Sequence, residues 1–128
     1  MPRPRLDTRS VKTVLIADDE DFLRLLVRET LLGYRVVEAR DGVEALYLAR
    51  EATPDLVILD WMMPGCDGIE VLRALRADAA MQHVPVLMMT AKTGASERAA
   101  LETAGATAVL AKPFSTRELR ASVGEILG

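Results

Sequence analysis

Residues 56–68 decide the fold of this chain, and they read LVILDWMMPGCDG. Residues 56–59 are apolar without alternation, which predicts a strand that is covered on both faces, as in a parallel sheet. Asp60 ends this strand, and the proline and glycines that follow it predict a loop. In open α/β sheets, ligands bind at the edge formed by the carboxyl ends of the strands, so Asp60 is a candidate site residue. Taken alone, Asp60 could also simply cap the next helix.

Further apolar segments predict strands at residues 14–17, 36–39, 86–90 and 108–111, and those at 14–17 and 86–90 are predicted to be buried like the strand that ends at Asp60. Segments with apolar residues at helical spacing follow each strand, at residues 21–32, 41–53, 67–78, 97–104 and 115–127. Strict alternation of strands and helices predicts a single α/β domain, in which a parallel sheet carries helices on both faces.

Local signals mark where several of these helices begin. Capping boxes are predicted where an Asp or Ser is followed three residues later by Glu, at Asp41–Glu44, Asp67–Glu70 and Ser115–Glu118. Ser96 is a candidate N-cap for the helix at 97–104, which is rich in alanine and short of large apolar residues. We expect that helix to bury little area and to be mobile. In the first helix, we expect Phe22 to enter the core.

Composition bounds the class of protein. The chain has 128 residues, half of them hydrophobic, which suits the core of one domain. No apolar run approaches the roughly 20 residues of a membrane span, so we expect no membrane association. The single cysteine, Cys66, excludes an internal disulfide and indicates a cytoplasmic protein. We interpret Cys66 as an incidental small apolar residue rather than a redox switch.

Charge is distributed unevenly along the chain. Residues 1–12 carry four basic residues and one acidic residue, so with a total of −3 the remaining chain carries −6. We interpret residues 1–12 as a basic, disordered N-terminal extension and residues 13–128 as the folded domain. Scattered cations without aromatic residues are a weak nucleic-acid signal, and the acidic domain argues against direct DNA binding.

Polar residues stand at four of the predicted strand ends: Asp18 and Asp19, Asp60, Thr90, and Lys112. In a parallel sheet these ends share one edge, so the side chains should meet. Clustered carboxylates repel each other unless a cation is near, and Lys112 supplies only one positive charge. Oxygen ligands suit a hard divalent ion such as Mg²⁺. A phosphoryl group on Asp60 would then be neutralised by the metal, the lysine and the threonine hydroxyl together.

These residues resemble the receiver domain of two-component response regulators. The resemblance covers roughly residues 13–127 and rests on Asp18-Asp19, on Asp60 with its MMPGCDG sequel, on Thr90-Ala91 and on Lys112-Pro113-Phe114. It implies a flavodoxin-like (βα)5 fold, whose parallel five-stranded sheet has the strand order 2-1-3-4-5. It also implies a cis peptide bond between Lys112 and Pro113.

The resemblance implies a role for each site residue. Asp60 would be the phosphoacceptor, with Thr90 and Lys112 contacting the phosphoryl group. Mg²⁺ would be held by Asp19 and Asp60 directly, by Asp18 mainly through water, and by the backbone carbonyl of Met62.

The partners follow from the same resemblance. The phosphodonor would be a sensor histidine kinase or a histidine phosphotransfer protein, and a downstream effector protein or output domain would read the phosphorylated state. The domain would be a signalling module rather than an enzyme acting on other substrates, and it would be a monomer or a weak, phosphorylation-dependent dimer.

The chain departs from the family pattern at three places. Val109 stands where the family usually has an aromatic switch residue, so we expect activation to act through residues 91–96 and the helix after them. The segment from Asp18 to Tyr34 is about two residues shorter than is usual in the family, so either the first helix loses part of a turn or residues are missing from the sequence. Thr107-Ala108 stands where DNA-binding regulators of the family often have an acidic pair. The absence of this pair weakens the expectation that the chain forms the symmetric dimer of those regulators, which uses the fourth and fifth helices.

Two other classes of protein use a similar sheet. An aspartyl-nucleophile, Mg²⁺-dependent phosphatase would need a second aspartate two residues after the nucleophile, where this chain has Met62, which cannot transfer a proton. A flavin-binding domain would need a phosphate-binding loop after the first strand, but the acidic residues 18–21 would repel a phosphate. Both alternatives are therefore disfavoured.

Overall fold

The computed structural model describes residues 11–128. The strands are β1 (Thr13–Ala17), β2 (Arg35–Ala39), β3 (Leu56–Asp60), β4 (Val86–Thr90) and β5 (Ala108–Ala111). The helices are α1 (Asp21–Thr30), α2 (Gly42–Ala52), α3 (Gly68–Ala77), α4 (Ala95–Ala104) and α5 (Thr116–Leu127). The expected basic extension falls almost wholly outside the described residues. Within them, no helix is both long and apolar enough to cross a membrane.

All five strands are parallel, and their order across the sheet is β2-β1-β3-β4-β5. This confirms the predicted flavodoxin-like fold. β3, the strand on which the prediction was built, lies in the centre, with Ala17 of β1 in register with Leu59 and Met89 of β4 in register with Asp60. The central strands β1, β3 and β4 are buried along their whole length, which explains their unbroken apolar sequences.

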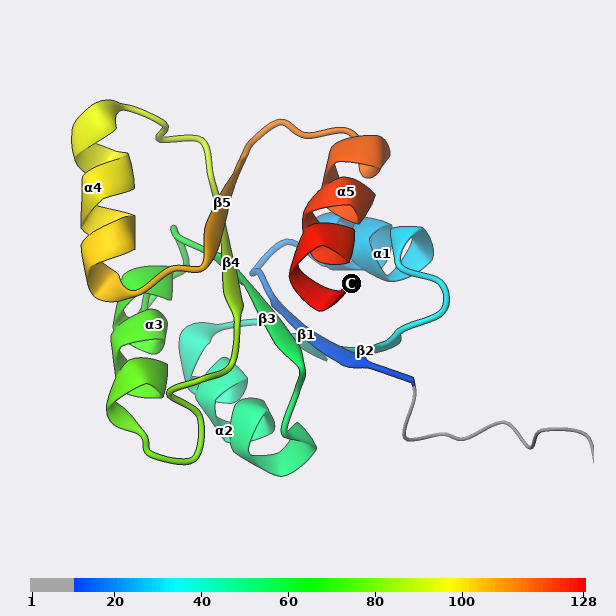
Figure 1. Ribbon diagram of the computed structural model, residues 1–128, viewed down its shortest axis with the longest axis horizontal. Helices are drawn as coiled ribbons and strands as arrows, with labels where there is room; N and C mark the ends of the chain where they lie inside the picture. The colour runs from blue at the N-terminus through cyan, green and yellow to red at the C-terminus, as the bar shows by residue number, and fades with distance from the viewer. Residues whose placement is uncertain (1–10) are drawn as a thin grey trace, which may run out of the picture.

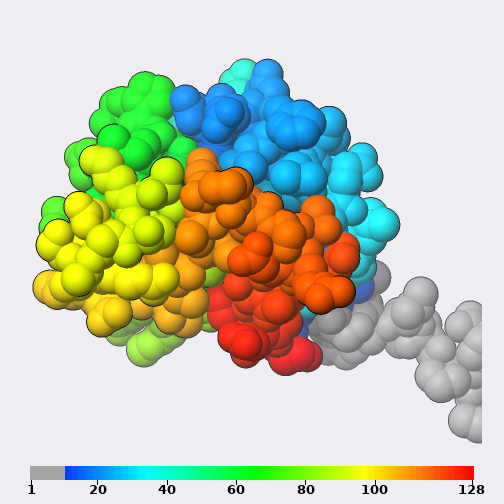
Figure 2. Space-filling model, turned by 90° about the horizontal axis from the view of Figure 1, so that it is seen from above, coloured from blue at the N-terminus to red at the C-terminus, as the bar shows by residue number. Residues whose placement is uncertain are grey.

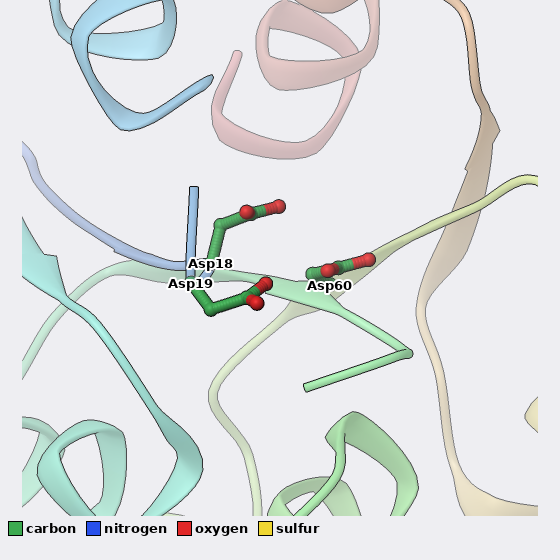
Figure 3. Close-up of side chains that lie close together, drawn as sticks. All are labelled: Asp18, Asp19 and Asp60. Carbon is green, nitrogen blue, oxygen red and sulfur yellow. The ribbon is translucent and has the colours of Figure 1, made fainter. Parts of the chain in front are cut away.

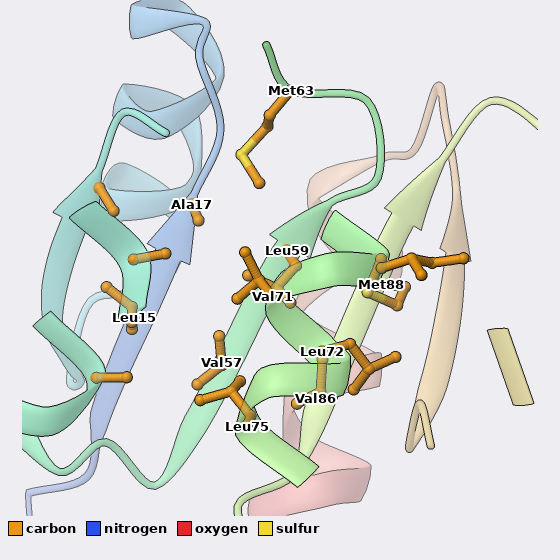
Figure 4. Packing of buried hydrophobic residues seen from close by; sticks show 14 of the residues in the cluster. Leu15, Ala17, Val57, Leu59, Met63, Val71, Leu72, Leu75, Val86 and Met88 are labelled. Carbon is orange, nitrogen blue, oxygen red and sulfur yellow. The ribbon is translucent and has the colours of Figure 1, made fainter. Parts of the chain in front are cut away.

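Helices cover the sheet on both faces, as Figure 1 shows: α1 and α5 lie on one face, and α2, α3 and α4 lie on the other. Alternate strand residues divide between two core layers. Leu15, Val57 and Leu59 pack with the layer of α2, α3 and α4 (Figure 4). Ile16 and Ile58 pack with the layer of α1 and α5. The fold therefore brings the carboxyl ends of all the strands to one edge.

The predicted helix starts are largely confirmed. Reciprocal capping boxes join Asp67 with Glu70 and Ser115 with Glu118. Asp41 caps α2 by accepting a hydrogen bond from the Glu44 amide, but the Glu44 side chain accepts from the Arg40 amide instead of the Asp41 amide. These caps fix the point at which the chain turns from each loop into its helix.

The prediction for the first helix was wrong about Phe22 and about the residue at which the helix ends. Phe22 is 74% exposed. The buried face of α1 carries Arg24 and Val27, continued by Leu31, and at 100° per residue Phe22 points away from that stripe. The helix ends at Thr30: the Leu31 amide still bonds to the Val27 carbonyl, but the Leu31 backbone, with φ −97° and ψ 50°, has left the helical conformation.

The start of α4 also differs from the prediction. Its N-cap is Gly94, not Ser96, which lies inside the first turn and bonds to Glu97. The low burial expected of this helix is confirmed, since Leu101 is the one buried residue among its ten. α4 is therefore attached to the domain through a single large apolar side chain.

Candidate functional site

Three carboxylates gather at the carboxyl edge of the sheet. Asp18 and Asp19 follow β1, and Asp60 is the last residue of the neighbouring strand β3. One carboxylate oxygen from each lies within 4.8 Å of the others, and Figure 3 shows the three side chains next to one another. The sequence predicted this cluster because parallel strands place their carboxyl ends together.

Asp18 is the most firmly held of the three. It is fully buried, and its amide donates to the Ala39 carbonyl of β2 at 3.1 Å. Its Oδ1 accepts a hydrogen bond from the Glu20 amide at 2.8 Å. Asp19, by contrast, is exposed, so its position depends mainly on the backbone turn that carries it.

Lys112, which directly follows β5, joins the cluster from the other side. Its Nζ lies 3.0 Å from Asp60 Oδ1 and 3.2 Å from Asp18 Oδ2. Its amide donates to the Thr90 carbonyl at 2.9 Å, and the expected cis peptide bond to Pro113 is confirmed. The ammonium group therefore bridges the two buried carboxylates.

The electrostatics of the cluster show that it lacks positive charge. Burial, followed by repulsion from Asp18, raises the pKa of Asp60 from 3.8 to about 6, although Lys112 and a backbone hydrogen bond from Met62 oppose the rise. Burial alone would lower the pKa of Lys112, but the hydrogen bond and charge of Asp60, together with Asp18, outweigh it and raise that pKa. One ammonium group faces three carboxylates, so a further cation would stabilise the site.

A hard divalent cation fits this donor set. The cluster offers carboxylate oxygens from three residues around one point, which is the coordination chemistry that Mg²⁺ prefers. The side chain of Met62 is 56% exposed. Its thioether is not needed for a metal site, and the predicted role of its backbone carbonyl stays a prediction.

Thr90 lies at the same edge of the sheet, and its hydroxyl bonds to the following loop. It is buried at the end of β4, and its Oγ1 accepts a hydrogen bond from the Lys92 amide at 2.8 Å. The hydroxyl is thus hydrogen-bonded to the loop that leads to α4.

The loop after Asp60 is folded back against the strand that precedes it. The Gly68 amide donates to the Trp61 carbonyl at 2.8 Å, and a Cβ atom at Gly68 would lie only 2.3 Å from the Asp60 carbonyl oxygen. Only glycine permits this approach. Trp61, half-buried beside Asp60, packs against the core and can report on the site.

Cys66, in the same loop, gains no support as a redox switch. Burial, followed by the nearby charges of Glu70, Asp67 and Asp41, raises the pKa of its thiol and so disfavours the reactive thiolate.

The edge that holds the site is open to solvent. Figure 2 faces this edge and shows the chain after β1 (blue) near the connection between β5 and α5 (orange). A hollow there is lined by Glu20 and Leu23 on one side and by Ala91, Lys112 and Phe114 on the other. Lys112 therefore lies between this hollow and the buried carboxylate of Asp60, to which its ammonium group is bonded.

Sequence reasoning missed Arg24. It is a buried cation on the inward face of α1, and its Nη1 donates to the Asp18 backbone carbonyl at 2.6 Å. One signal was present in the sequence: Asp21 and Arg24 are spaced for an ion pair on one helix face, and that face meets the acidic turn.

A family model of the response regulator receiver domain matches residues 14–124. The chain belongs to this family. Its curated relatives include a response regulator and two transcriptional regulatory proteins. Response regulator MprA of Mycobacterium sp. strain KMS is 44% identical over 116 residues, covering 89% of this chain and 50% of its own length. PhoP of Bacillus subtilis is 42% identical over 118 residues, covering 91% of this chain and 48% of its own length.

PhoB of Pseudomonas aeruginosa is 38% identical over 118 residues, covering 91% of this chain and 52% of its own length. The receiver chain thus spans about half the length of these curated relatives. Among solved structures, the chemotaxis protein CheY4 of Vibrio cholerae superposes with a TM-score of 0.88 at 35% identity, covering 92% of this chain and 100% of its own. The fold and the family of the receiver domain therefore agree with the resemblance in the sequence.

Proposed function

We propose that this receiver domain, residues 13–128, accepts a phosphoryl group on Asp60 in a Mg²⁺-dependent reaction. The observation that carries the proposal is the position of Asp60: nearly buried, 3.0 Å from the Lys112 ammonium group, and in one cluster with Asp18 and Asp19. The phosphodonor would be a phosphohistidine on a sensor histidine kinase or on a histidine phosphotransfer protein.

The chemistry follows from the groups around Asp60. A carboxylate oxygen of Asp60 attacks the phosphorus of the phosphohistidine. The new P–O bond forms as the P–N bond to the donor imidazole breaks. The electrons of the P–N bond return to the imidazole nitrogen, which then takes a proton from solvent. Mg²⁺ held by Asp18, Asp19, Asp60 and the Met62 carbonyl would neutralise charge on the phosphoryl oxygens. Lys112 is already placed to balance the same charge from the other side.

The pKa of Asp60 suits this role. At about 6 it leaves the carboxylate mostly ionised, and therefore nucleophilic, at neutral pH. The phosphatase alternative stays disfavoured, because the residue two positions after Asp60 is Met62, whose thioether cannot serve as a general acid.

Phosphorylation would switch the domain through Thr90 and α4. The Thr90 hydroxyl now bonds to Lys92, and its rotation toward a phosphoryl oxygen would break that bond. The helix that follows is held by one buried residue, Leu101, so it can shift at low cost. Val109 has no aromatic ring or hydroxyl to follow the movement, so the switch would depend on residues 91–96 and α4. Unchanged amide exchange there on phosphorylation would contradict this.

The signal would be passed on by protein contacts in the cytoplasm. Several relatives are transcriptional regulators about twice as long as this chain, which favours an output domain or a separate effector protein as the reader. We propose that the receiver itself does not contact nucleic acid and is a monomer or a weak dimer that forms on phosphorylation.

A titration tests the phosphoacceptor site. Purified protein is titrated with Mg²⁺ and then with beryllofluoride, which mimics a phosphoryl group on a carboxylate, while Trp61 fluorescence is followed. The proposal expects saturable changes with both reagents, with the second requiring Mg²⁺ and lost in Asp60→Asn. A fluorescence signal that stays flat with both reagents would contradict it.

A further inference from the structure

Arg24 is an unusual residue to find buried in a small domain. It is 6% exposed, although arginines are almost never buried unless they are paired. Its guanidinium group contacts three residues, two in the turn from β1 into α1 and one on β2. Nη1 donates to the Asp18 carbonyl at 2.6 Å, and Nε pairs with Glu38 of β2 at 3.3 Å. Nη2 pairs with Asp21 at the start of α1.

The charge of Arg24 is balanced without the carboxylates of the site. Asp21 and Glu38 flank its guanidinium group, and the second oxygen of Glu38 pairs with Arg28 at 3.0 Å. Two arginines and two acids therefore form a linear chain of three ion pairs, from Asp21 through Arg24 and Glu38 to Arg28. The direct link from this chain to the site is the hydrogen bond from Arg24 to the Asp18 carbonyl.

That carbonyl belongs to the peptide unit that joins Asp18 to Asp19. Asp18 has other anchors, because its amide is held by Ala39 and its carboxylate by Glu20 and Lys112. Asp19 is exposed, so the orientation of this peptide unit sets where its carboxylate points. A planar guanidinium group with three acceptor residues fixes that orientation better than a flexible ammonium group could.

We propose that Arg24 is a positioning residue for metal binding: it holds the Asp18–Asp19 peptide so that the Asp19 carboxylate stays beside Asp60. The inference rests on the proposed function, since it concerns the same Mg²⁺ site. Groups that orient metal ligands in this way change metal affinity by roughly 10–100-fold when they are removed. The metal affinity of the domain is therefore set partly by a residue that does not touch the metal.

The test measures Mg²⁺ affinity by Trp61 fluorescence in Arg24→Met and Arg24→Lys, at a temperature where each is folded. We expect Arg24→Met to bind Mg²⁺ roughly 10–100-fold more weakly than the wild type, and Arg24→Lys to recover only part of the loss. In the metal-free protein, the amide resonances of Asp19 and Glu20 should shift in both variants, which reports on the turn independently of metal binding.

Two matched arginines separate positioning from stability. Arg28→Met removes the other partner of Glu38 but leaves the Asp18 carbonyl untouched. Arg76→Met removes a guanidinium group that donates to the Gly105, Gln82 and Val84 carbonyls, outside the site. The inference expects both variants to keep wild-type Mg²⁺ affinity, even though Arg76→Met should be less stable.

If Arg24→Met does not fold, Arg24→Lys and Glu38→Gln decide the question, because Glu38→Gln loosens one anchor of Arg24 at a partly exposed position. Weaker Mg²⁺ binding in these two variants, with the controls unchanged, supports the inference. Wild-type affinity in both, or an equal loss in Arg76→Met, overturns it. A wild-type protein that binds no Mg²⁺ overturns the proposed function and this inference together, whereas tight wild-type binding with unaffected variants overturns this inference alone.

Discussion

Replacing Asp60 with Asn should stabilise the metal-free domain at neutral pH. The folded protein keeps the Asp60 proton up to about pH 6, whereas the unfolded chain loses it near the ordinary value of 3.8. Between these values the folded state binds more protons than the unfolded state, so stability falls as pH rises. The shift corresponds to about 3 kcal/mol at pH 7.5, where both states are ionised. Asn keeps the shape of the side chain and removes this cost.

The assay is urea unfolding in EDTA, followed by Trp61 fluorescence, from pH 4 to pH 8. The difference in unfolding free energy between Asp60→Asn and the wild type should be near zero at pH 4 and should grow through pH 6 to about 3 kcal/mol. Saturating Mg²⁺ should narrow the gap, because it stabilises only a folded protein that can bind it. A difference that does not depend on pH, or a wild type that is more stable at pH 8, would refute the reasoning.

Three further substitutions test the lysine, the loop and the helix around the site. Lys112→Met removes the hydrogen bond and charge that oppose the raised pKa of Asp60, so the pH midpoint of the stability change should move upward in the same urea series. Gly68→Ala drives a Cβ atom into the backbone at Asp60 and should cost about 1–3 kcal/mol or more, measured by urea unfolding. Leu101→Ala should cost about 2–5 kcal/mol and speed amide exchange in α4.

The strands and the site were predictable because their signals are local. Buried parallel strands have unbroken apolar sequences, and each one here runs directly into its polar residue, as β3 does into Asp60. Once the strands were parallel, their carboxyl ends had to meet. Thr90 was placed at the correct edge by the same argument, although the direction of its hydroxyl toward Lys92 depends on the loop.

The inward face of α1 was not predictable in the same way. Phe22 and Leu25 form an apolar stripe as convincing as the true one, yet they are 74% and 47% exposed. The inward side is fixed by the packing of Val27 and Leu31 in the core and by the contacts of Arg24 with the acidic turn and with β2, all of which join residues from separate elements. The start of α4 was missed because a Gly N-cap has no side-chain signal.

The central claim is that Asp60 accepts a phosphoryl group. The most direct measurement is the intact mass of the protein after incubation with phosphoramidate, a small-molecule phosphodonor, with and without Mg²⁺, followed by peptide mapping. The account predicts a mass gain of one phosphoryl group that maps to Asp60, requires Mg²⁺ and is absent in Asp60→Asn. Modification at another residue, or an equal gain in Asp60→Asn, would contradict it.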